Sequence, residues 1–172
     1  LVLPIIKLGK PTIAAINGAA AGIGISLAAA CDIRIASTNA RFASAWVKLA
    51  LIPDEGGTWF LPHIIGTARA LEFMYLGGVI DAMEAERIGL VNKAVAPEEL
   101  MPTAIEMATK IANGPPIALR LTKEAVYRNL VRELEEQIDF EKHAQEICNS
   151  SDDHKEGVAA FIEKREPSFK GR

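Results

Sequence analysis

The sequence predicts an α/β fold in which strands and helices alternate in the first part of the chain and helices dominate the rest. Two observations carry this prediction. Short apolar runs rich in isoleucine alternate with small-residue stretches as far as residue 65, and from Gly66 onward apolar residues recur at helical spacing. We therefore divide the 172 residues into a core part, 1–65, and a mainly helical part, 66–172.

The first part contains two strand signals. Residues 11–18, PTIAAING, form an apolar run bounded by proline and Asn-Gly, which is typical of a strand buried on both faces. Residues 19–32 follow as a small-residue glycine turn and a helix, and residues 32–37, DIRIAS, alternate like a second strand. A further helix is expected to start in DEGGTWFL, residues 54–61. Ligands of a parallel layer bind at the carboxyl ends of its strands.

The second part is predicted to be mostly helical. Within residues 67–78, TARALEFMYLGG, we expect a helix that ends at Gly77. Asp81 and Glu84 have the spacing of a capping box at the start of the next helix. One short strand is expected within 90–97. Helical apolar spacing then covers 97–114, 115–130 and 131–153, and the last segment, 155–172, places Val158, Phe161 and Ile162 on one helical face.

Composition excludes several classes of protein. The formal charge of −3 gives no basic field for nucleic acid, and no apolar run approaches the roughly 18 residues of a membrane span. Cys31 and Cys148 lack CxxC spacing, which favours a reducing, cytoplasmic location. The three histidines, His63, His143 and His154, lack metal-ligand spacing, so no metal site is expected. The opening LVLPIIKL has no initiator methionine, and we expect the chain to begin within the fold of a longer protein.

Two motifs leave alternatives open. GIGISL, from Gly22, has Leu27 where a dinucleotide motif needs its third glycine, so a Rossmann site is rejected. The glycines either let a ligand oxygen approach N–H groups at a helix start, as half an oxyanion hole, or only allow close helix packing. Asp54 is either a catalytic carboxylate or a helix N-cap, and Glu55 suits the first helical turn. Trp46 and Trp59 flank this turn and either wall an apolar pocket or belong to the core.

Together, these pieces resemble a known family. KPTIAAINGAAAGIGISLAAACDIRIAS, KLALIPDEGGTWFLP and EGVAAFIEKREPSF are similar to the enoyl-CoA hydratase/isomerase (crotonase) superfamily over nearly the whole chain. KLALIPDEGGTWFLP looks most like the isomerases of 2-(1,2-epoxy-1,2-dihydrophenyl)acetyl-CoA in phenylacetate catabolism. The resemblance implies a crotonase-like core of ββα spiral turns, whose first turns lie upstream of this chain, and a helical carboxyl-terminal region that forms homotrimers or hexamers.

The resemblance also implies a site. The N–H of Ile23, between Gly22 and Gly24, supplies one donor of an oxyanion hole for an acyl-CoA thioester. Ser26 and Trp46 occupy the positions of the two glutamates that activate water in hydratases, and neither is an acid or base near neutral pH. Asp54 occupies the position of the single carboxylate of the isomerase branch. Burial in an apolar pocket disfavours a charged carboxyl group and so suits it to carrying protons.

At the carboxyl-terminal end, Phe161 and Lys164 match positions that lie against the coenzyme A of a neighbouring subunit; packing and solvated roles remain the alternatives. The implied activity is acyl-CoA isomerisation without a separate cofactor, since coenzyme A is part of the substrate. A hydratase or thioester hydrolase of the same superfamily, and a catalytically silent acyl-CoA-binding subunit, are the alternatives. The implied substrate-binding residues are Gly22, Gly24, Ser26, Trp46, Phe161 and Lys164.

Overall fold

The computed structural model of the chain describes residues 1–114, 116–127, 130–165 and 167–168, and it contains two three-stranded sheets. The first sheet has the order β1-β3-β6 and is parallel, with β1 at Ile13–Ile16, β3 at Ile33–Ser37 and β6 at Lys93–Val95. The second has the order β2-β4-β5, with β2 at Ala19–Ala21, β4 at Arg41–Ala43 and β5 at Val79–Asp81. Strand β2 pairs parallel with β4, and β5 pairs antiparallel with β4.

The pairing explains the course of the chain. Strand β3 lies beside β1 and β4 lies beside β2, so the second strand pair stacks on the first with the same order of elements. Helix α2, Ile23–Ala30, follows the first pair, and the 3-10 turn η1, Val47–Leu49, and helix α3, Gly57–Ile65, follow the second. This repetition is the ββα spiral that the resemblance implies.

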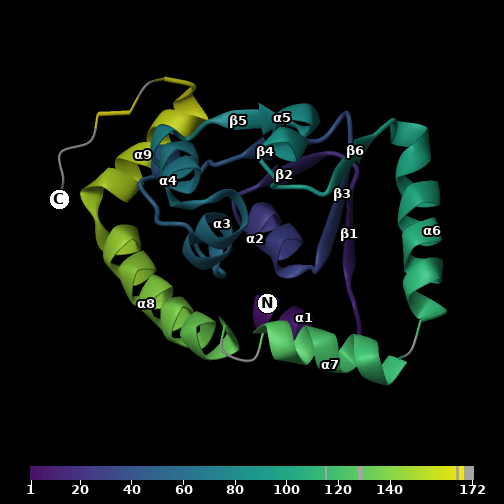
Figure 1. The fold of residues 1–172 in the computed structure, drawn as a ribbon. Coiled ribbons are helices and arrows are strands. Elements are labelled where there is room, and N and C mark those ends of the chain that lie inside the picture. Colours follow the sequence, from purple (N-terminus) through teal and green to yellow (C-terminus); the bar gives the residue numbers. More distant parts are fainter. Residues whose placement is uncertain (115, 128–129, 166, 169–172) are drawn as a thin grey trace.

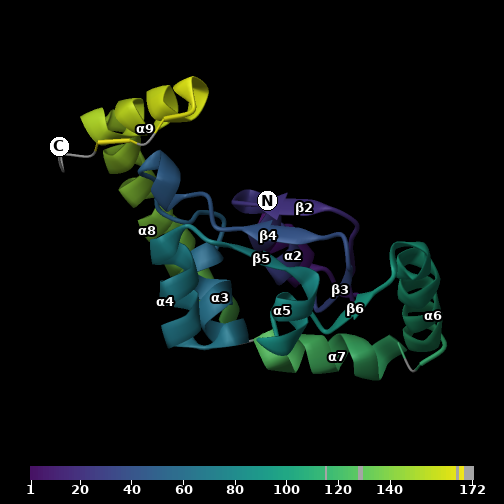
Figure 2. The same cartoon turned by 90° about the horizontal axis from the view of Figure 1, so that it is seen from above.

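The remaining helices surround this core. Helix α1 spans Val2–Lys7 and buries Val2 and Ile6 against the core. Helices α6 to α9 run around the outside of the molecule in Figures 1 and 2. The bounds of the other helical elements are α4 Thr67–Leu76, α5 Ala82–Arg87, η2 Pro97–Glu99, α6 Leu100–Ala112, α7 Pro116–Tyr127, α8 Leu130–Ser150 and α9 Asp152–Glu163.

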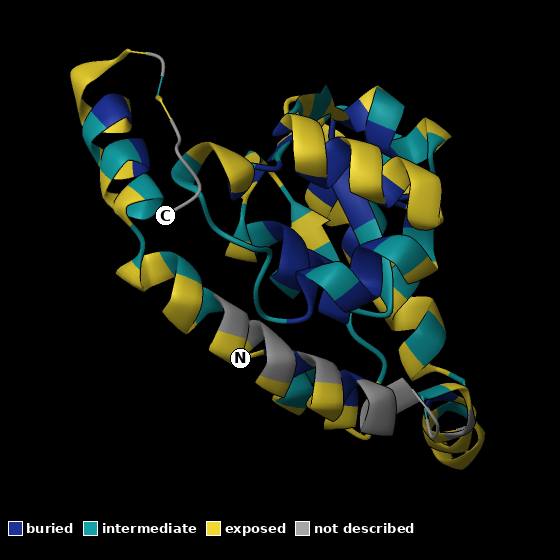
Figure 3. Ribbon diagram, turned by 90° about the vertical axis from the view of Figure 1, so that its left-hand side faces the viewer, coloured by how far each residue is buried: buried dark blue, intermediate teal, exposed yellow. Residues whose placement is uncertain are grey.

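Helix α2 lies at the centre of the molecule (Figure 1). It contacts α1, α3 and β2, and its residues Ile25, Ser26 and Ala28 to Ala30 are buried. Alanine side chains suit this position because neighbouring elements approach the helix from several sides, leaving little room for larger groups. Figure 3 shows buried residues gathered in the middle of the molecule and exposed residues over the outer helices.

Several predicted elements are confirmed. The strands within 11–18 and 32–37 form as β1 and β3, and the strand within 90–97 forms as β6. The Asp81 carboxylate accepts a hydrogen bond from the N–H of Glu84 at 2.8 Å, as a capping box requires. Gly77 ends α4 in the left-handed conformation, with φ of 59°. Val158, Phe161 and Ile162 share an exposed face of α9.

The expectation for residues 19–21 is wrong: the sequence predicts a small-residue turn, and they form β2. Ala20 lies opposite Phe42 in a parallel pair with β4, and this pairing makes the stretch extended. Strands β5 and β6 follow residue 66 and complete both sheets, so sheet residues occur on both sides of the proposed division. The division into a core part and an oligomerisation part stays a prediction.

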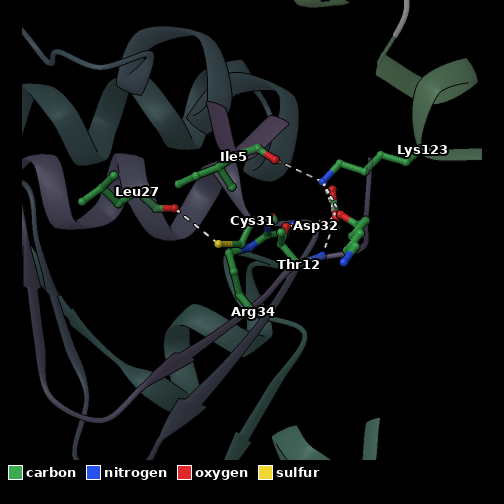
Figure 4. Close-up of polar contacts among 8 residues, drawn as sticks. Ile5, Thr12, Leu27, Cys31, Asp32, Arg34 and Lys123 are labelled. Carbon is green, nitrogen blue, oxygen red and sulfur yellow. Dashed lines mark hydrogen bonds and ion pairs between the residues drawn. The ribbon is translucent and has the colours of Figure 1, made fainter. Parts of the chain in front are cut away.

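A partly buried polar cluster around Asp32 ties α7 to this core (Figure 4). Asp32 Oδ2 accepts hydrogen bonds from the Thr12 N–H at 2.7 Å and from Lys123 Nζ at 2.8 Å. Lys123 also donates to the main-chain oxygens of Ile5, at 3.2 Å, and Lys10, at 3.1 Å. Burial, and after it the nearby Asp32 carboxylate, raises the pKa of Tyr127 to about 12. Lys123 of α7 thus connects α1, the segment before β1 and the residue that precedes β3 through its hydrogen bonds.

Replacement of Lys123 should destabilise the protein strongly. The Lys123 side chain is 7% exposed, so a Lys123→Met variant leaves the Asp32 carboxylate in the interior without its cation. We expect a loss of about 3–5 kcal/mol in the free energy of unfolding, measured by urea denaturation. Lys155→Met is the control, because the Lys155–Asp152 pair is exposed and should change stability by less than about 1 kcal/mol. Equal stability of the two variants would contradict a clamping role for Lys123.

Candidate active site

The start of α2 presents main-chain donors. Gly22, the N-cap of this helix, has a φ of 50°, a conformation that residues with a Cβ rarely adopt. Its N–H donates to the carbonyl oxygen of Ala43 at 3.1 Å, which fixes the turn against the end of β4. In the described part of the chain, no residue accepts a hydrogen bond from the N–H of Ile23. This donor at the positive end of the helix is therefore available to an oxyanion.

The loop that carries Asp54 lies beside α2. Ser26, one helical turn after Ile23, is fully buried and donates from Oγ to the main-chain oxygen of Asp54 at 2.9 Å. The same oxygen accepts from the N–H of Gly57 at 2.9 Å. The carboxylate of Asp54 is directed elsewhere: its Oδ1 accepts from the indole Nε1 of Trp46 at 3.1 Å. Asp54 is partly buried, and Oδ2 has no donor among the described residues.

The capping alternative for Asp54 is wrong. Helix α3 begins at Gly57, its N-cap is Gly56 with φ of 80°, and no side chain caps it. The Asp54 side chain bonds to Trp46 instead. The carboxylate is thus held by a side chain, and its other oxygen has no donor among the described residues, an arrangement that suits a proton carrier.

Trp46 lies between the two helix starts. It is 4% exposed and packs in the core cluster with Ile25 and Phe42. A Cβ on Gly22 would lie 3.6 Å from its Nε1, and a Cβ on Gly57 would lie 3.6 Å from its Cζ2. The indole ring therefore fills the space between the first turns of α2 and α3.

Gly57 is a part of the site that the sequence analysis missed. A Cβ at this position would lie 3.0 Å from Pro53 Cβ and 3.1 Å from Ser26 Oγ, closer than ordinary contacts allow. Glycine is needed here because the first turn of α3 presses against the Ser26–Asp54 contact. The Gly56-Gly57 pair directly after the two acids was the available signal. Gly24, in contrast, leaves room for a Cβ, 3.8 Å from that of Ala20.

The structure corrects the expectation for Glu55 and decides between the alternatives for Trp59. Glu55 precedes α3 instead of lying in its first turn, with φ of 47°, and its Oε2 accepts a hydrogen bond from the main-chain N–H of Val2 at 3.4 Å. Trp59 belongs to the core: it packs in a cluster with Val2 and Leu134, separate from that of Trp46, and its ring stacks on His63.

Phe161 and Lys164 lie apart from these residues. Helix α9 packs on η1, where His154 Nδ1 contacts the Leu49 oxygen at 2.9 Å. Phe161 is 75% exposed, and Lys164 is exposed in the left-handed conformation just after the helix. The structure thus joins Gly22, Ile23, Ser26, Trp46 and Asp54 in one site and leaves Phe161 and Lys164 on an outer surface.

The structure also bears on metal and membrane binding. Within the described ranges, no group of three or more histidine, cysteine, aspartate or glutamate side chains is placed to hold a metal ion. A search of the same residues finds no helix with the length and hydropathy of a transmembrane span.

Comparison with known proteins gives one family. The family described as enoyl-CoA hydratase/isomerase matches residues 1–172. The chain is 46% identical over 166 residues to the short-chain-enoyl-CoA hydratase of Clostridium acetobutylicum, a match that covers 96% of this chain and 64% of that protein. It is 42% identical to the 1,2-epoxyphenylacetyl-CoA isomerase of Escherichia coli, with 100% of this chain and 66% of that protein covered. The chain thus spans about two thirds of the length of these relatives.

A solved structure confirms the crotonase-like fold predicted from the sequence. The enoyl-CoA hydratase from Mycobacterium avium subsp. paratuberculosis superposes with a TM-score of 0.94 at 34% identity, with 99% of this chain and 69% of that chain covered. The resemblance to the superfamily, stated on sequence motifs, is confirmed by the family match. The roles of the individual site residues stay predictions.

The Ser26 hydroxyl should stabilise the site measurably. Ser26→Ala removes the hydrogen bond to the buried Asp54 main chain, and we expect a loss of about 1–2 kcal/mol in urea denaturation. Ser44→Ala is the matched control: Ser44 is equally buried, and its Oγ has no hydrogen-bond partner in the described ranges of the chain. That variant should match or exceed the stability of the wild type, since it removes an unsatisfied group. A larger loss from Ser44→Ala than from Ser26→Ala would contradict the assignment.

Proposed function

Because the chain belongs to the enoyl-CoA hydratase/isomerase family, we propose that the protein is an acyl-CoA isomerase that uses Asp54 as its single acid/base. The observation that carries the proposal is the surroundings of Asp54. The two residues at the hydratase glutamate positions, Ser26 and Trp46, are both hydrogen-bond donors to Asp54. The site therefore contains one carboxylate, that of Asp54, and two neutral donors, one to its carboxylate and one to its main chain. A single carboxylate suits the transfer of one proton between two carbon atoms.

The proposed reaction begins with the thioester oxygen of a 3-enoyl-CoA accepting a hydrogen bond from the Ile23 N–H. Asp54 Oδ2 takes a proton from C2, and the electron pair of that C–H bond moves toward the thioester as an enolate. The protonated carboxyl group then returns the same proton to C4, and the double bond shifts to C2–C3. The oxyanion donor stabilises the charge where it develops, which is the largest contribution in comparable sites.

A ring-epoxide acyl-CoA is the second substrate that we propose for the same site. The 42% identical relative named 1,2-epoxyphenylacetyl-CoA isomerase favours it. Ring opening and expansion of such an epoxide is also an isomerisation: it needs an enolate held at the thioester and one group to move a proton. Coenzyme A arrives and leaves as part of either substrate, and we propose no separate cofactor.

Hydration is the alternative reaction, and the 46% identical relative named as a hydratase favours it. Addition of water needs a base that activates the water in addition to the enolate donor. Neither Ser26 nor Trp46 can act as that base, so hydration would depend on Asp54 alone. A catalytically silent acyl-CoA-binding subunit is the third possibility, and it would bind the thioesters without converting them.

We further propose that α9 meets the coenzyme A bound to a neighbouring subunit of a homotrimer or hexamer. The exposed apolar residues Val158, Phe161 and Ile162 offer a surface for such a contact. Phe161 would lie against the coenzyme A, and Lys164, at the end of the helix, would approach its phosphates.

Asp54→Asn should abolish isomerisation. A panel of 2-enoyl, 3-enoyl and ring-epoxide CoA thioesters is offered to the full-length protein, and products are separated by chromatography. We expect the rate with the 3-enoyl or epoxide substrate to fall by about 10²–10⁴, because the proton carrier is lost, while thioester binding persists. Glu55→Gln is the control and should keep the rate, since its side chain faces α1. Rapid hydration of the 2-enoyl thioester by the wild type would favour the hydratase, and binding without turnover would favour the silent subunit.

Removal of the Ile23 N–H should slow the same reaction. Ile23 is the first residue of α2, a position where proline fits the helix, so Ile23→Pro removes the N–H together with a side chain that is 39% exposed. We expect a loss of about 10²–10³ in kcat. Asp152→Pro, at the first position of α9, is the matched control and should retain activity. Equal rates for the two variants would exclude Ile23 as the oxyanion donor.

A further inference from the structure

The hydrogen bond from Trp46 to Asp54 constrains the orientation of the proposed proton carrier. Trp46 Nε1 donates to Oδ1 of Asp54 at 3.1 Å, and the ring is 4% exposed. A buried indole that packs against both helix starts cannot turn away without opening the core. The direction of its N–H is therefore fixed by packing, and the carboxylate must align with it.

The main chain of Asp54 is fixed independently. Ser26 Oγ and the N–H of Gly57 both donate to its carbonyl oxygen at 2.9 Å. Ser26 belongs to α2, three residues after Ile23. The backbone of the Asp54 loop is thus held at a set distance from the oxyanion donor, and only the rotation of the carboxylate remains to be defined.

We propose that Trp46 is a positioning residue that defines this rotation: its N–H holds Oδ1 of Asp54, so that Oδ2 alone carries the proton between the two carbon atoms of the substrate. The inference rests on the proposed isomerase function and adds a role for a residue that the resemblance placed only at the substrate. Without the indole N–H, the carboxyl group turns freely and its proton exchanges with water before it is returned.

The chain contains a matched control for this role. Trp59 is the only other tryptophan, and it is nearly as buried, at 8% exposure. Its Nε1 has no hydrogen-bond partner in the described structure, and the ring packs in the core cluster that contains Val2 and Leu134. Trp46→Phe and Trp59→Phe each remove an indole N–H and a similar part of the ring. The first change is next to Asp54, and the second is away from it.

The test compares the two variants of the full-length protein in H₂O and D₂O. We expect Trp46→Phe to lower kcat by about 10- to 100-fold, the effect of one hydrogen bond to a charged group, with KM changed by less than about threefold. In D₂O it should raise the deuterium content of the product several-fold. Trp59→Phe should keep the wild-type kcat, KM and deuterium content of the product. A folded Trp46→Phe variant with wild-type kcat and deuterium content would overturn the proposal, as would equal losses in the two variants.

A direct readout of the contact separates this inference from the proposed function. In the NMR spectrum of Trp59→Phe, the indole N–H resonance of Trp46 is identified by its loss on Trp46→Phe, and it should shift and exchange faster with solvent when Asp54→Ala is added. An unchanged resonance would overturn the positioning role whatever the reaction is. A wild type that converts no acyl-CoA isomer would instead overturn the proposed function, and with it the step assigned to Oδ2.

If Trp46→Phe does not fold, 3-benzothienylalanine is incorporated at position 46 in the Trp59→Phe background. This residue keeps the shape of the ring and has sulfur in place of N–H. The same fall in kcat and rise in deuterium content is expected, and wild-type values would overturn the proposal.

Discussion

The burial of α2 from several sides is the constraint on which the rest of the structure depends. Because α1, α3 and β2 all contact this helix, its side chains must be small, and its one buried polar residue, Ser26, must find a partner. The partner is the main-chain oxygen of Asp54. The helix that carries the free Ile23 N–H thereby also sets the position of the carboxylate, so the packing of the core and the geometry of the site have one cause.

The two flanking glycines follow from the same constraint. The indole of Trp46 fills the gap between α2 and α3, and both Gly22 and Gly57 face it. Gly22 also adopts a positive φ, which starts α2 directly after β2. At Gly57 the reason is steric, since Pro53 and Ser26 leave no room for a Cβ. A side chain at Gly57 would therefore press on Ser26, the residue that holds the main chain of Asp54.

Features with local signals could be predicted from the sequence. The isoleucine-rich strands, the Asp81 capping box and the Gly77 helix end depend on residues a few positions apart, and all three form as expected. Strand β2 could not be predicted, because three alanines carry no local strand signal and only their pairing with the later strand β4 makes them extended. The capping alternative for Asp54 failed for a related reason: α3 begins at Gly57, and the carboxylate accepts from Trp46, eight positions earlier.

The roles of Ser26 and Trp46 show why overall similarity does not decide the reaction. Relatives that are 46% and 42% identical carry the names of a hydratase and an isomerase, so total identity to this chain does not separate the two. In this chain Trp46 donates to the carboxylate of Asp54 and Ser26 donates to its main-chain oxygen, and both donors are neutral. These local contacts, which total identity does not measure, bear on the choice between the two reactions.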